Sequence, residues 1–175
     1  KNDNYLPIIK KIVQSGINYN LIVEDRNYLM FCGWWNMEKT LKYLVDYSQI
    51  NIHHLDNHNN NILFYVTGLY SEQGNLELLN FLIDKGIDYK HINNDGYNLL
   101  FVAAGVGGYN YYDHEIMKYL LQMIELEHLD KENNTFLSYL EQEYLEFLVE
   151  EKILNNQDKV VMEQIYSKNI VKLMP

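Results

Sequence analysis

A ten-residue segment in the middle of the chain, INNDGYNLLF at residues 92–101, decides how the rest of the sequence is read. Its polar half, from Asn93 to Gly96, has the composition of a turn, because Asn and Asp open turns and Gly tolerates a positive φ. Its apolar half begins directly after Asn98, and a polar side chain at such a place caps the N-terminus of a helix. The segment therefore predicts a turn that leads into a short helix.

The same pattern recurs on both sides of this segment. LDNHNNNILF at residues 55–64 aligns with it, as does LDKENNTFLS at residues 129–138, and a weaker copy has Asn27 at the capping position. Intervals of 37 residues separate the capping positions Asn61, Asn98 and Thr135. Four periods of turn, short helix, loop and longer helix follow, and a period in the thirties built from paired helices is typical of a solenoid.

A second part of the repeat marks the end of each longer helix. GINY at residues 16–19, QINI at 49–52 and GIDY at 86–89 each end an apolar stretch with a helical period. We align ELEH at residues 125–128 with them as a degenerate fourth copy. Gly directly after a helical pattern predicts a C-terminal cap in the left-handed conformation.

On these residues the chain resembles the ankyrin repeat family over roughly residues 5–150. The best match is the third period, where Gly96, Leu100, Ala103 and Ala104 fall on family positions. The resemblance implies an all-α fold, an ankyrin-like α-solenoid of stacked helix-turn-helix repeats with terminal capping helices. The chain departs from the family in lacking its Thr-Pro-Leu-His motif and in having long loops between paired helices, which are places that commonly carry recognition.

We expect a single domain, divided in the following way. An N-terminal cap helix falls within residues 1–22, and repeats occupy residues 23–55, 56–92, 93–129 and 130–155. A C-terminal amphipathic helix falls within residues 156–175, where capping is favoured over docking to another molecule because a solenoid must protect its last apolar layer.

Composition limits the classes of function. The chain has 175 residues, of which 47% are hydrophobic, enough for one domain with a core. Its 14 Lys and Arg residues against 24 Asp and Glu residues give a net charge of -10. We therefore expect no nucleic-acid partner and no membrane partner, because both require a cationic face. We expect a cytoplasmic monomer, of the producing cell or of an infected host cell. The first residue is Lys1 rather than Met, which leaves a longer chain upstream open.

Signals of catalysis or metal binding are weak. The sequence has no Gly-rich phosphate loop, no paired-Cys zinc motif and no nucleophile elbow. One metal-like grouping falls on a predicted turn, where a solvated polar turn is favoured over a metal site: His53, His54, Asp56 and His58. Cys32 aligns with the small residue Ala103, which predicts a core role. Asp113 is predicted to start a helix. We expect no enzyme activity and no cofactor.

What remains is a surface. In the ankyrin family, partners bind at the turn tips and at the exposed edges of the first helices. Carried over position by position, this implies contact residues Glu24, Arg26, Trp34 and Trp35 in the first period, Asn57, His58, Asn60, Leu69 and Tyr70 in the second, Asn94, Asp95, Tyr97, Tyr109, Tyr111 and Tyr112 in the third, and Lys131, Glu132, Asn134, Gln142 and Glu143 in the fourth. Trp and Tyr at solvent-facing positions are typical of binding hot spots. Packing of Trp34 or Tyr111 onto the solenoid is the alternative.

The sequence thus predicts a non-catalytic protein-protein interaction module that binds through its concave face, turn tips and long inter-helix loops. Because the net charge is -10, we expect the partner to present a basic surface. One role that fits is a host-interaction adaptor. The alternative is an immunity or antitoxin-type inhibitor that masks a basic surface of a toxin or enzyme.

Overall fold

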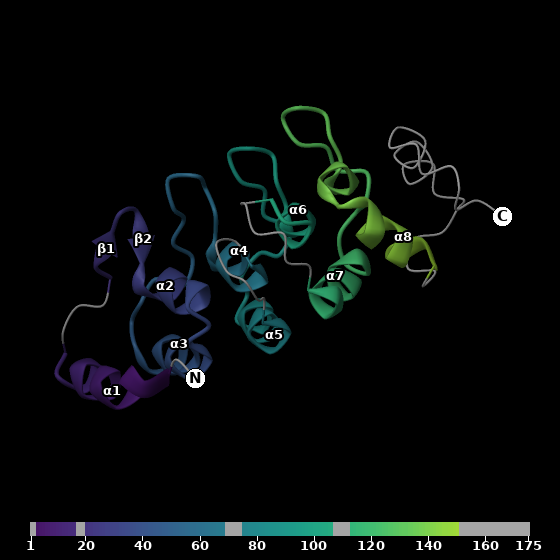
Figure 1. Ribbon diagram of the computed structural model, residues 1–175. Helices are drawn as coiled ribbons and strands as arrows, with labels where there is room; N and C mark the ends of the chain where they lie inside the picture. Colours follow the sequence, from purple (N-terminus) through teal and green to yellow (C-terminus); the bar gives the residue numbers. More distant parts are fainter. Residues whose placement is uncertain (1–2, 17–19, 69–74, 107–112, 151–175) are drawn as a thin grey trace.

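The computed structural model describes residues 3–16, 20–68, 75–106 and 113–150, and within them the chain forms a row of helix pairs (Figure 1). The elements in chain order are η1 (Asp3–Tyr5), α1 (Leu6–Gln14), β1 (Ile22–Val23), β2 (Arg26–Asn27), α2 (Tyr28–Trp34), α3 (Glu38–Tyr47), α4 (Ile62–Thr67), α5 (Leu76–Asp84), α6 (Leu99–Ala103), α7 (His114–Leu121), η2 (Phe136–Tyr139) and α8 (Gln142–Glu150).

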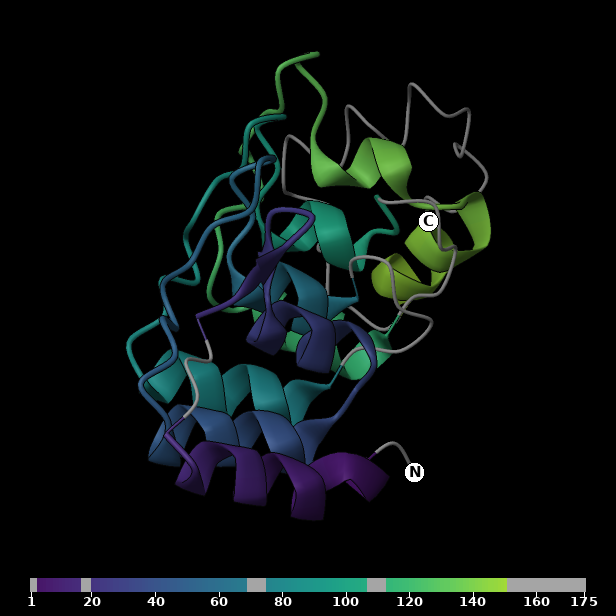
Figure 2. The same ribbon diagram turned by 90° about the vertical axis from the view of Figure 1, so that its left-hand side faces the viewer.

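The helices form two layers, and the turns project from the edge of one of them (Figures 1 and 2). In the layer next to the turns, α2 packs against α4, α4 against α6, and α6 against η2. In the other layer, α1 packs against α3 and α3 against α5. Contacts between α2 and α3, α4 and α5, and α6 and α7 join the two layers. This is the side-by-side stacking that the repeat period predicted.

The core runs along the row without interruption. One fully buried leucine occupies an equivalent position in the first helical segment of each repeat: Leu29, Leu63, Leu100 and Leu137. Truncating a leucine in such a site to alanine typically costs about 2–5 kcal/mol. Cys32 is also fully buried, as its alignment with Ala103 predicted. Each repeat therefore hides its apolar flank against its neighbours.

Asparagine caps the first helix of three repeats, as predicted. The side-chain oxygens of Asn27, Asn61 and Asn98 accept hydrogen bonds from the backbone N–H groups of Met30, Leu63 and Leu100. In the fourth repeat Thr135 stands at this position without a side-chain capping bond, and its buried hydroxyl has no hydrogen-bond partner among the described residues. The segment that follows is the 3-10 helix η2 rather than an α-helix.

The turns and two of the helix ends pass through left-handed residues, as predicted. Asn59, Gly96 and Asn133 hold equivalent places in three successive turns, with φ of 62°, 85° and 62°. Gly16 after α1 and Gly86 after α5 have φ of 75° and 87°. Asp113 caps α7, since its carboxylate accepts from two backbone N–H groups of the first turn, as its predicted place at a helix start requires.

The first turn differs from the others because it is a small β-hairpin. Strands β1 and β2 pair in the antiparallel sense, with Ile22 opposite Asn27. The two connecting residues, Glu24 and Asp25, have φ of 48° and 70°, as a two-residue hairpin turn of type I′ requires. These strands were not predicted from the repeat pattern, and they are the one departure from an all-α architecture among the described residues.

The predicted alignment of the fourth helix end is wrong by two residues. Ile50, Ile87 and Ile124 are all buried, and the last two stand 37 residues apart, so Met123 rather than Glu125 occupies the place of Gly86. A residue with a Cβ disfavours the left-handed conformation that glycine adopts there. The chain therefore leaves α7 by another path. After α5 the N–H of Ile87 donates to the carbonyl of Leu82, five residues back, whereas after α7 the N–H of Ile124 donates to Leu120, four residues back.

Helix α1 lies inside the N-terminal cap region predicted at residues 1–22, and its side chain Lys10 lies over the Tyr43 ring of α3, with Nζ 5.3 Å from the ring centre. The C-terminal helix predicted within residues 156–175 lies outside the described residues. Most of both long inter-helix loops, at residues 69–74 and 107–112, lies outside them as well.

Candidate interaction surface

Hydrogen bonds join each turn to the next, so the turn tips form a continuous row. The backbone N–H of Asn94 donates to the carbonyl of His58 at 2.8 Å, and the N–H of Lys131 donates to the carbonyl of Asp95 at 3.1 Å. The first hairpin joins the row through Asp25, whose carboxylate accepts from the N–H of Asn57 at 2.9 Å. Because backbone groups make most of these bonds, the spacing of the tips is fixed by the fold.

A row of histidines, which sequence reasoning missed, also ties each turn to the one before it. The Nε2 atoms of His54, His91 and His128 lie 2.7, 2.6 and 2.7 Å from the carbonyl oxygens of Asp25, Asn59 and Gly96. A carbonyl oxygen only accepts, so each Nε2 carries the proton. The accepting residue has a positive φ in every case. The signal was present in the sequence, since these histidines recur at intervals of 37 residues.

Buried carboxylates organise the second and fourth turns. Asp56 Oδ1 accepts from the N–H groups of His58 and Asn60, at 2.9 and 2.8 Å. Its Oδ2 accepts from the Asn60 amide at 2.9 Å and from the Tyr65 hydroxyl at 2.6 Å. Burial raises the pKa of Tyr65 far above its ordinary value, and the hydrogen bond to the Asp56 carboxylate raises it further. The tyrosine is therefore a proton donor in a structural bond.

Asp130 and Tyr139 repeat this arrangement 74 residues later, with 2.5 Å between the Tyr139 hydroxyl and Asp130 Oδ2. Burial by itself would raise the pKa of Asp130, but bonds from Tyr139 and from the backbone N–H groups of Asn134 and Glu132 outweigh it and lower that pKa. In the third turn Asn93 takes the place of the aspartate. Its Oδ1 accepts from the N–H groups of Asp95 and Tyr97, each at 2.9 Å.

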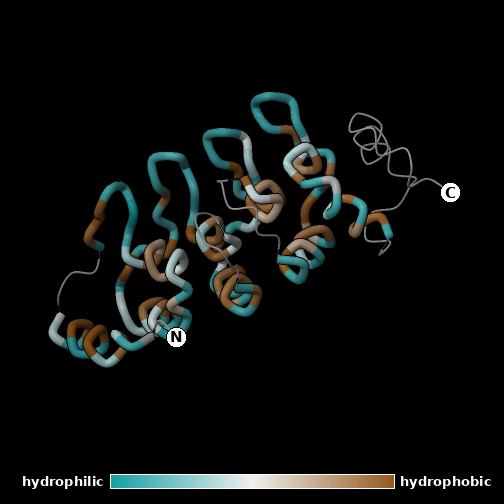
Figure 3. Tube along the Cα trace, in the orientation of Figure 1, coloured by the Kyte–Doolittle hydropathy of each residue, from teal (hydrophilic) through white to brown (hydrophobic). Residues whose placement is uncertain are grey.

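Aliphatic side chains form an exposed row below the turn tips, where Figure 3 shows hydrophobic stretches on the limbs of successive turns. Equivalent positions in the four turns hold Leu21, Leu55, Ile92 and Leu129, whose exposed fractions are 68%, 40%, 43% and 48%. In the first hairpin the neighbours Ile22 and Val23 extend the row. Single exposed apolar residues need no explanation, but a row repeated on adjacent turns makes a continuous line of exposed apolar surface. We call this set of six residues the aliphatic row.

The tips above the aliphatic row carry several of the residues predicted to contact a partner. Glu24, His58, Asp95 and Glu132 are exposed there, as are Asn57, Asn94 and Lys131. Acidic side chains outnumber basic ones in this set. The structure therefore brings the predicted turn-tip residues together in one line along the solenoid.

The predicted residues of the first repeat form an aromatic cluster. The guanidinium of Arg26 lies 5.9 Å from the Trp34 ring centre, and its Nε donates to the Tyr65 hydroxyl at 2.8 Å. Trp34 is half-buried and stacks on Trp35, with 5.9 Å between ring centres, while Trp35 is exposed. Trp34 thus packs on its neighbours, as the alternative reading of that residue expected, and Trp35 presents its ring to solvent.

Asn60 requires a correction. It was predicted as a contact residue, but it is buried, because its amide donates to Asp56 and its side-chain oxygen accepts from the Asn93 amide at 2.9 Å. Tyr97 is half-buried and stacks on Phe101, with 5.2 Å between ring centres. Asn134 is half-buried and Glu143 is exposed. The remaining predicted contact residues lie outside the described residues or side chains: Leu69, Tyr70, Tyr109, Tyr111, Tyr112 and Gln142.

The described residues contain no group of three or more His, Cys, Asp or Glu side chains placed to hold a metal ion. In the metal-like grouping of the second turn, His54 is hydrogen-bonded to the carbonyl of Asp25. The carboxylate oxygens of Asp56 in the same grouping accept hydrogen bonds from its own turn and from Tyr65. In the part of the chain that is described, every helix is too short or too polar to cross a bilayer.

Comparison with known proteins identifies the fold. No family model matches the sequence, and no curated protein matches it. Among solved structures the chain is similar to EF0377, described as an ankyrin repeat protein, with a TM-score of 0.63 and 21% sequence identity. The match covers 78% of this chain and 68% of that chain. This chain therefore has an ankyrin-like α-solenoid fold, and the fold class predicted from the repeats is confirmed.

Proposed function

We propose that this chain is a non-catalytic module that binds another protein through the aliphatic row and the turn tips above it. The observation that carries the proposal is the recurrence of an exposed aliphatic side chain at one equivalent position in four successive turns, from Leu21 to Leu129. The turns that carry the row are hydrogen-bonded to one another, so a partner could contact it without first ordering them. Binding to a preorganised surface costs less free energy than binding to a mobile one.

The charge at the tips supports a basic partner. Glu24, Asp95 and Glu132 are exposed beside the aliphatic row, and the whole chain has a net charge of -10. A partner segment that alternates apolar residues with Lys or Arg would match both features. Electrostatic complementarity of this kind raises the association rate and is weakened by salt. The same surface would serve a host-interaction adaptor or an inhibitor that masks a basic toxin or enzyme.

The buried polar groups support a structural role for the titratable residues of the turns. The carboxylate of Asp56 is fully occupied by four hydrogen bonds from its own turn and from Tyr65. A group held in this way stabilises the turn and has no lone pair left for a substrate. This supports a binding module rather than an enzyme.

The test is a triple variant in the row, Leu21→Ser with Leu55→Ser and Leu129→Ser. All three side chains are exposed, so the thermal midpoint should change little. Affinity capture from an extract of the source organism, quantified by mass spectrometry, should lose a basic partner that the wild-type chain retains. The dissociation constant for that purified partner should rise by about tenfold or more.

The control is Tyr47→Ser, which removes a side chain that is as exposed as Leu21 from helix α3 on the other layer. This variant should bind as the wild type does. If the triple variant captures the same proteins with unchanged affinity, the aliphatic row is not the binding surface and the proposal is wrong.

A further inference from the structure

A hydrogen bond that two repeats make is missing in the third. The capping residues Asn27 and Asn61 use their second side-chain group, Nδ2, to donate to the carbonyls of Asn51 and Asp88, at 2.8 and 2.9 Å. The equivalent group of Asn98 donates to no described residue, although Asn98 is only 4% exposed. The Asn98 oxygen still caps its helix, through the N–H of Leu100 at 2.9 Å.

The cause lies in the path of the chain after α7. The residue equivalent to Asp88 is Glu125. Two residues before it stands Met123, whereas the earlier repeat has the left-handed Gly86 two residues before Asp88. Because the N–H of Ile124 bonds four residues back rather than five, the segment does not repeat the path that presents the Asp88 carbonyl to Asn61. The acceptor that the fold supplies elsewhere is therefore not supplied to Asn98.

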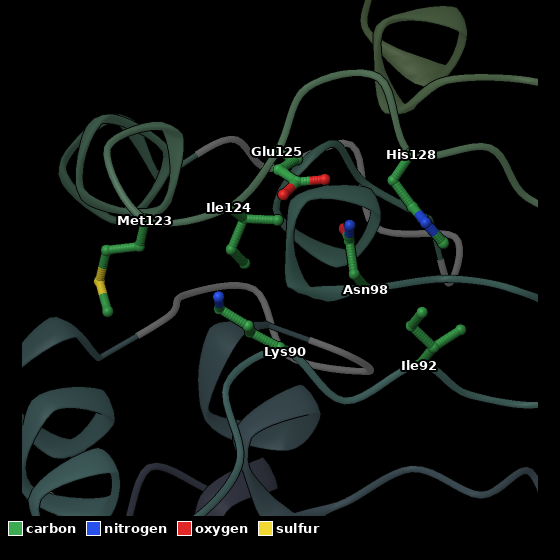
Figure 4. Close-up of a pocket in the computed structure, with 7 residues that line it drawn as sticks. All are labelled: Lys90, Ile92, Asn98, Met123, Ile124, Glu125 and His128. Atoms are coloured by element: carbon green, nitrogen blue, oxygen red, sulfur yellow. The ribbon is translucent and has the colours of Figure 1, made fainter.

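A pocket of about 210 Å³ occupies this place (Figure 4). Ile92, Met123 and Ile124 give it an apolar wall, and its polar lining is Lys90, Asn98, Glu125 and His128. In Figure 4 the Asn98 side chain points toward the segment that carries Glu125. Ile92 belongs to the aliphatic row as well, so the pocket opens beside the proposed binding surface.

The polar groups of the pocket define what can enter. Asn98 Nδ2 donates to no described residue and lines the pocket, so it can donate to a group that enters. Lys90 and Glu125 are both exposed, and no hydrogen bond or ion pair to a described residue occupies the Lys90 ammonium or the Glu125 carboxylate. His128 Nε2 is already used by the carbonyl of Gly96. The lining thus offers Asn98 and Lys90 as donors and Glu125 as an acceptor, and the charges of Lys90 and Glu125 cancel, which suits a neutral group that both accepts and donates.

We propose that this pocket binds the primary carboxamide of a Gln or Asn side chain from the protein partner. The carboxamide oxygen accepts from Asn98 Nδ2 and from Lys90, its NH₂ group donates to Glu125, and its short stem lies against the apolar lining of the pocket. A carboxylate of the same size can accept from Asn98 and Lys90 but has no N–H group to donate to Glu125, and an apolar side chain leaves Asn98 unsatisfied. The inference rests on the proposed binding function, since it assigns the pocket to a residue of that partner.

A titration with free probes tests the pocket without the partner. The probes are the N-acetyl, N-methylamide derivatives of glutamine, glutamate and leucine, which share the same backbone amides and differ in the side chain. The glutamine probe should give saturable NMR shift changes at the Asn98 side-chain amide and at Ile124. Its dissociation constant should be about tenfold lower than that of the other two probes. Equal affinity for glutamine and leucine, or shift changes elsewhere only, would overturn the inference.

Asn98→Asp is the sharpest variant, because aspartate is as good an N-terminal cap as asparagine but lacks the NH₂ group. The variant should keep its thermal midpoint within a few degrees and lose the preference for glutamine. Asn98→Ser, which also caps, should behave in the same way, so a charge effect of the aspartate cannot decide the result. Unchanged glutamine binding in both variants would overturn the inference.

The outcomes separate the pocket from the wider function. The triple variant of the aliphatic row leaves Ile92 and the rest of the pocket intact. If the probe fails to bind while that variant loses the partner, the pocket inference is wrong and the proposed function stands. If the probe binds and the triple variant retains the partner, the pocket is a carboxamide site and the proposed function is wrong.

Discussion

The second and third turns of the solenoid have the same hydrogen-bonded frame but different side-chain chemistry. In both, one oxygen of the first residue, Asp56 or Asn93, accepts from the N–H groups two and four residues later. The second polar group of the same side chain, Oδ2 of Asp56 or Nδ2 of Asn93, differs because its hydrogen-bond partner differs. Asp56 Oδ2 faces the Tyr65 hydroxyl, whereas Val102 stands at the equivalent position in the third repeat.

The difference shows that the turn needs one side-chain oxygen to accept from its backbone N–H groups. Whether the second polar group is an oxygen or an NH₂ depends on the side chains that lie beside it. The Asn93 amide donates to Asn60, the Asn60 amide donates to Asp56, and Tyr65 and Arg26 complete a chain of hydrogen bonds across three turns. In the second turn the Asp56 carboxylate accepts from two side-chain donors, Asn60 and Tyr65. In the third turn the Asn93 carboxamide donates to the side-chain oxygen of Asn60.

The largest expected effect comes from removing the carboxylate of the second turn. Asp56→Ala leaves the buried Asn60 groups and the Tyr65 hydroxyl without their acceptor, and should lower the free energy of unfolding by about 3–5 kcal/mol. Asn93→Ala, the matched change in the third turn, should cost about 1–3 kcal/mol because fewer buried donors lose a partner. Urea unfolding followed by circular dichroism measures both. Equal losses would show that the charge and the tyrosine add nothing to the turn.

A smaller effect is expected at the left-handed position, where the second turn has Asn59 and the third has Gly96. A Cβ added to Gly96 would lie 2.9 Å from the backbone nitrogen of Lys131 in the next turn, and its φ is 85°. Gly96→Ala should therefore cost about 2–4 kcal/mol, from conformational strain and from overpacking. The control is Gly86→Ala, where φ is 87° but no atom lies within 4 Å of the added carbon. It should cost about 1–2 kcal/mol, and a cost as large as that of Gly96→Ala would refute the close approach of the turns.

These comparisons also show which parts of the molecule could be predicted. The turn residues and the caps Asn27, Asn61 and Asn98 were readable because each is a local rule about one residue and its backbone. The same locality explains the mistaken fourth helix end. Met123 is not a residue type that predicts a C-terminal cap, as glycine is. The fourth copy was therefore aligned at Glu125, two residues too late.

The candidate surface was harder to predict because it depends on which side chains the stacked turns leave uncovered. Leu55, Ile92 and Leu129 read as ordinary apolar residues at the edge of each turn, and only the structure shows them exposed. Conversely, Asn60 reads as a solvated turn residue but lies inside the hydrogen-bond chain. Such positions are decided by contacts between repeats, which a local pattern does not contain.

The smallest effect tests the fourth turn, which shares its aspartate and tyrosine with the second. Because folding lowers the pKa of Asp130 below its ordinary value of 3.8, this group stabilises the fold above that pH and loses the contribution as the pH falls through the folded-state pKa. Tyr139→Phe removes one donor, so the pKa of Asp130 should rise toward the ordinary value. The loss of stability at neutral pH should be about 1–2 kcal/mol. An NMR titration of the Asp130 carboxyl carbon measures the shift, and an unchanged pKa would assign the lowering to the backbone N–H groups alone.

The junctions between turns have a consequence for how such a chain can grow. The left-handed residue of each turn offers its carbonyl to a histidine of the next, as Asn59 does to His91 and Gly96 does to His128. Since these junctions use the same kinds of donor and acceptor, duplication of one 37-residue unit would create a further junction that already fits. Gene duplication could thus lengthen the molecule in whole steps, and each added unit would bring one more exposed aliphatic side chain into line.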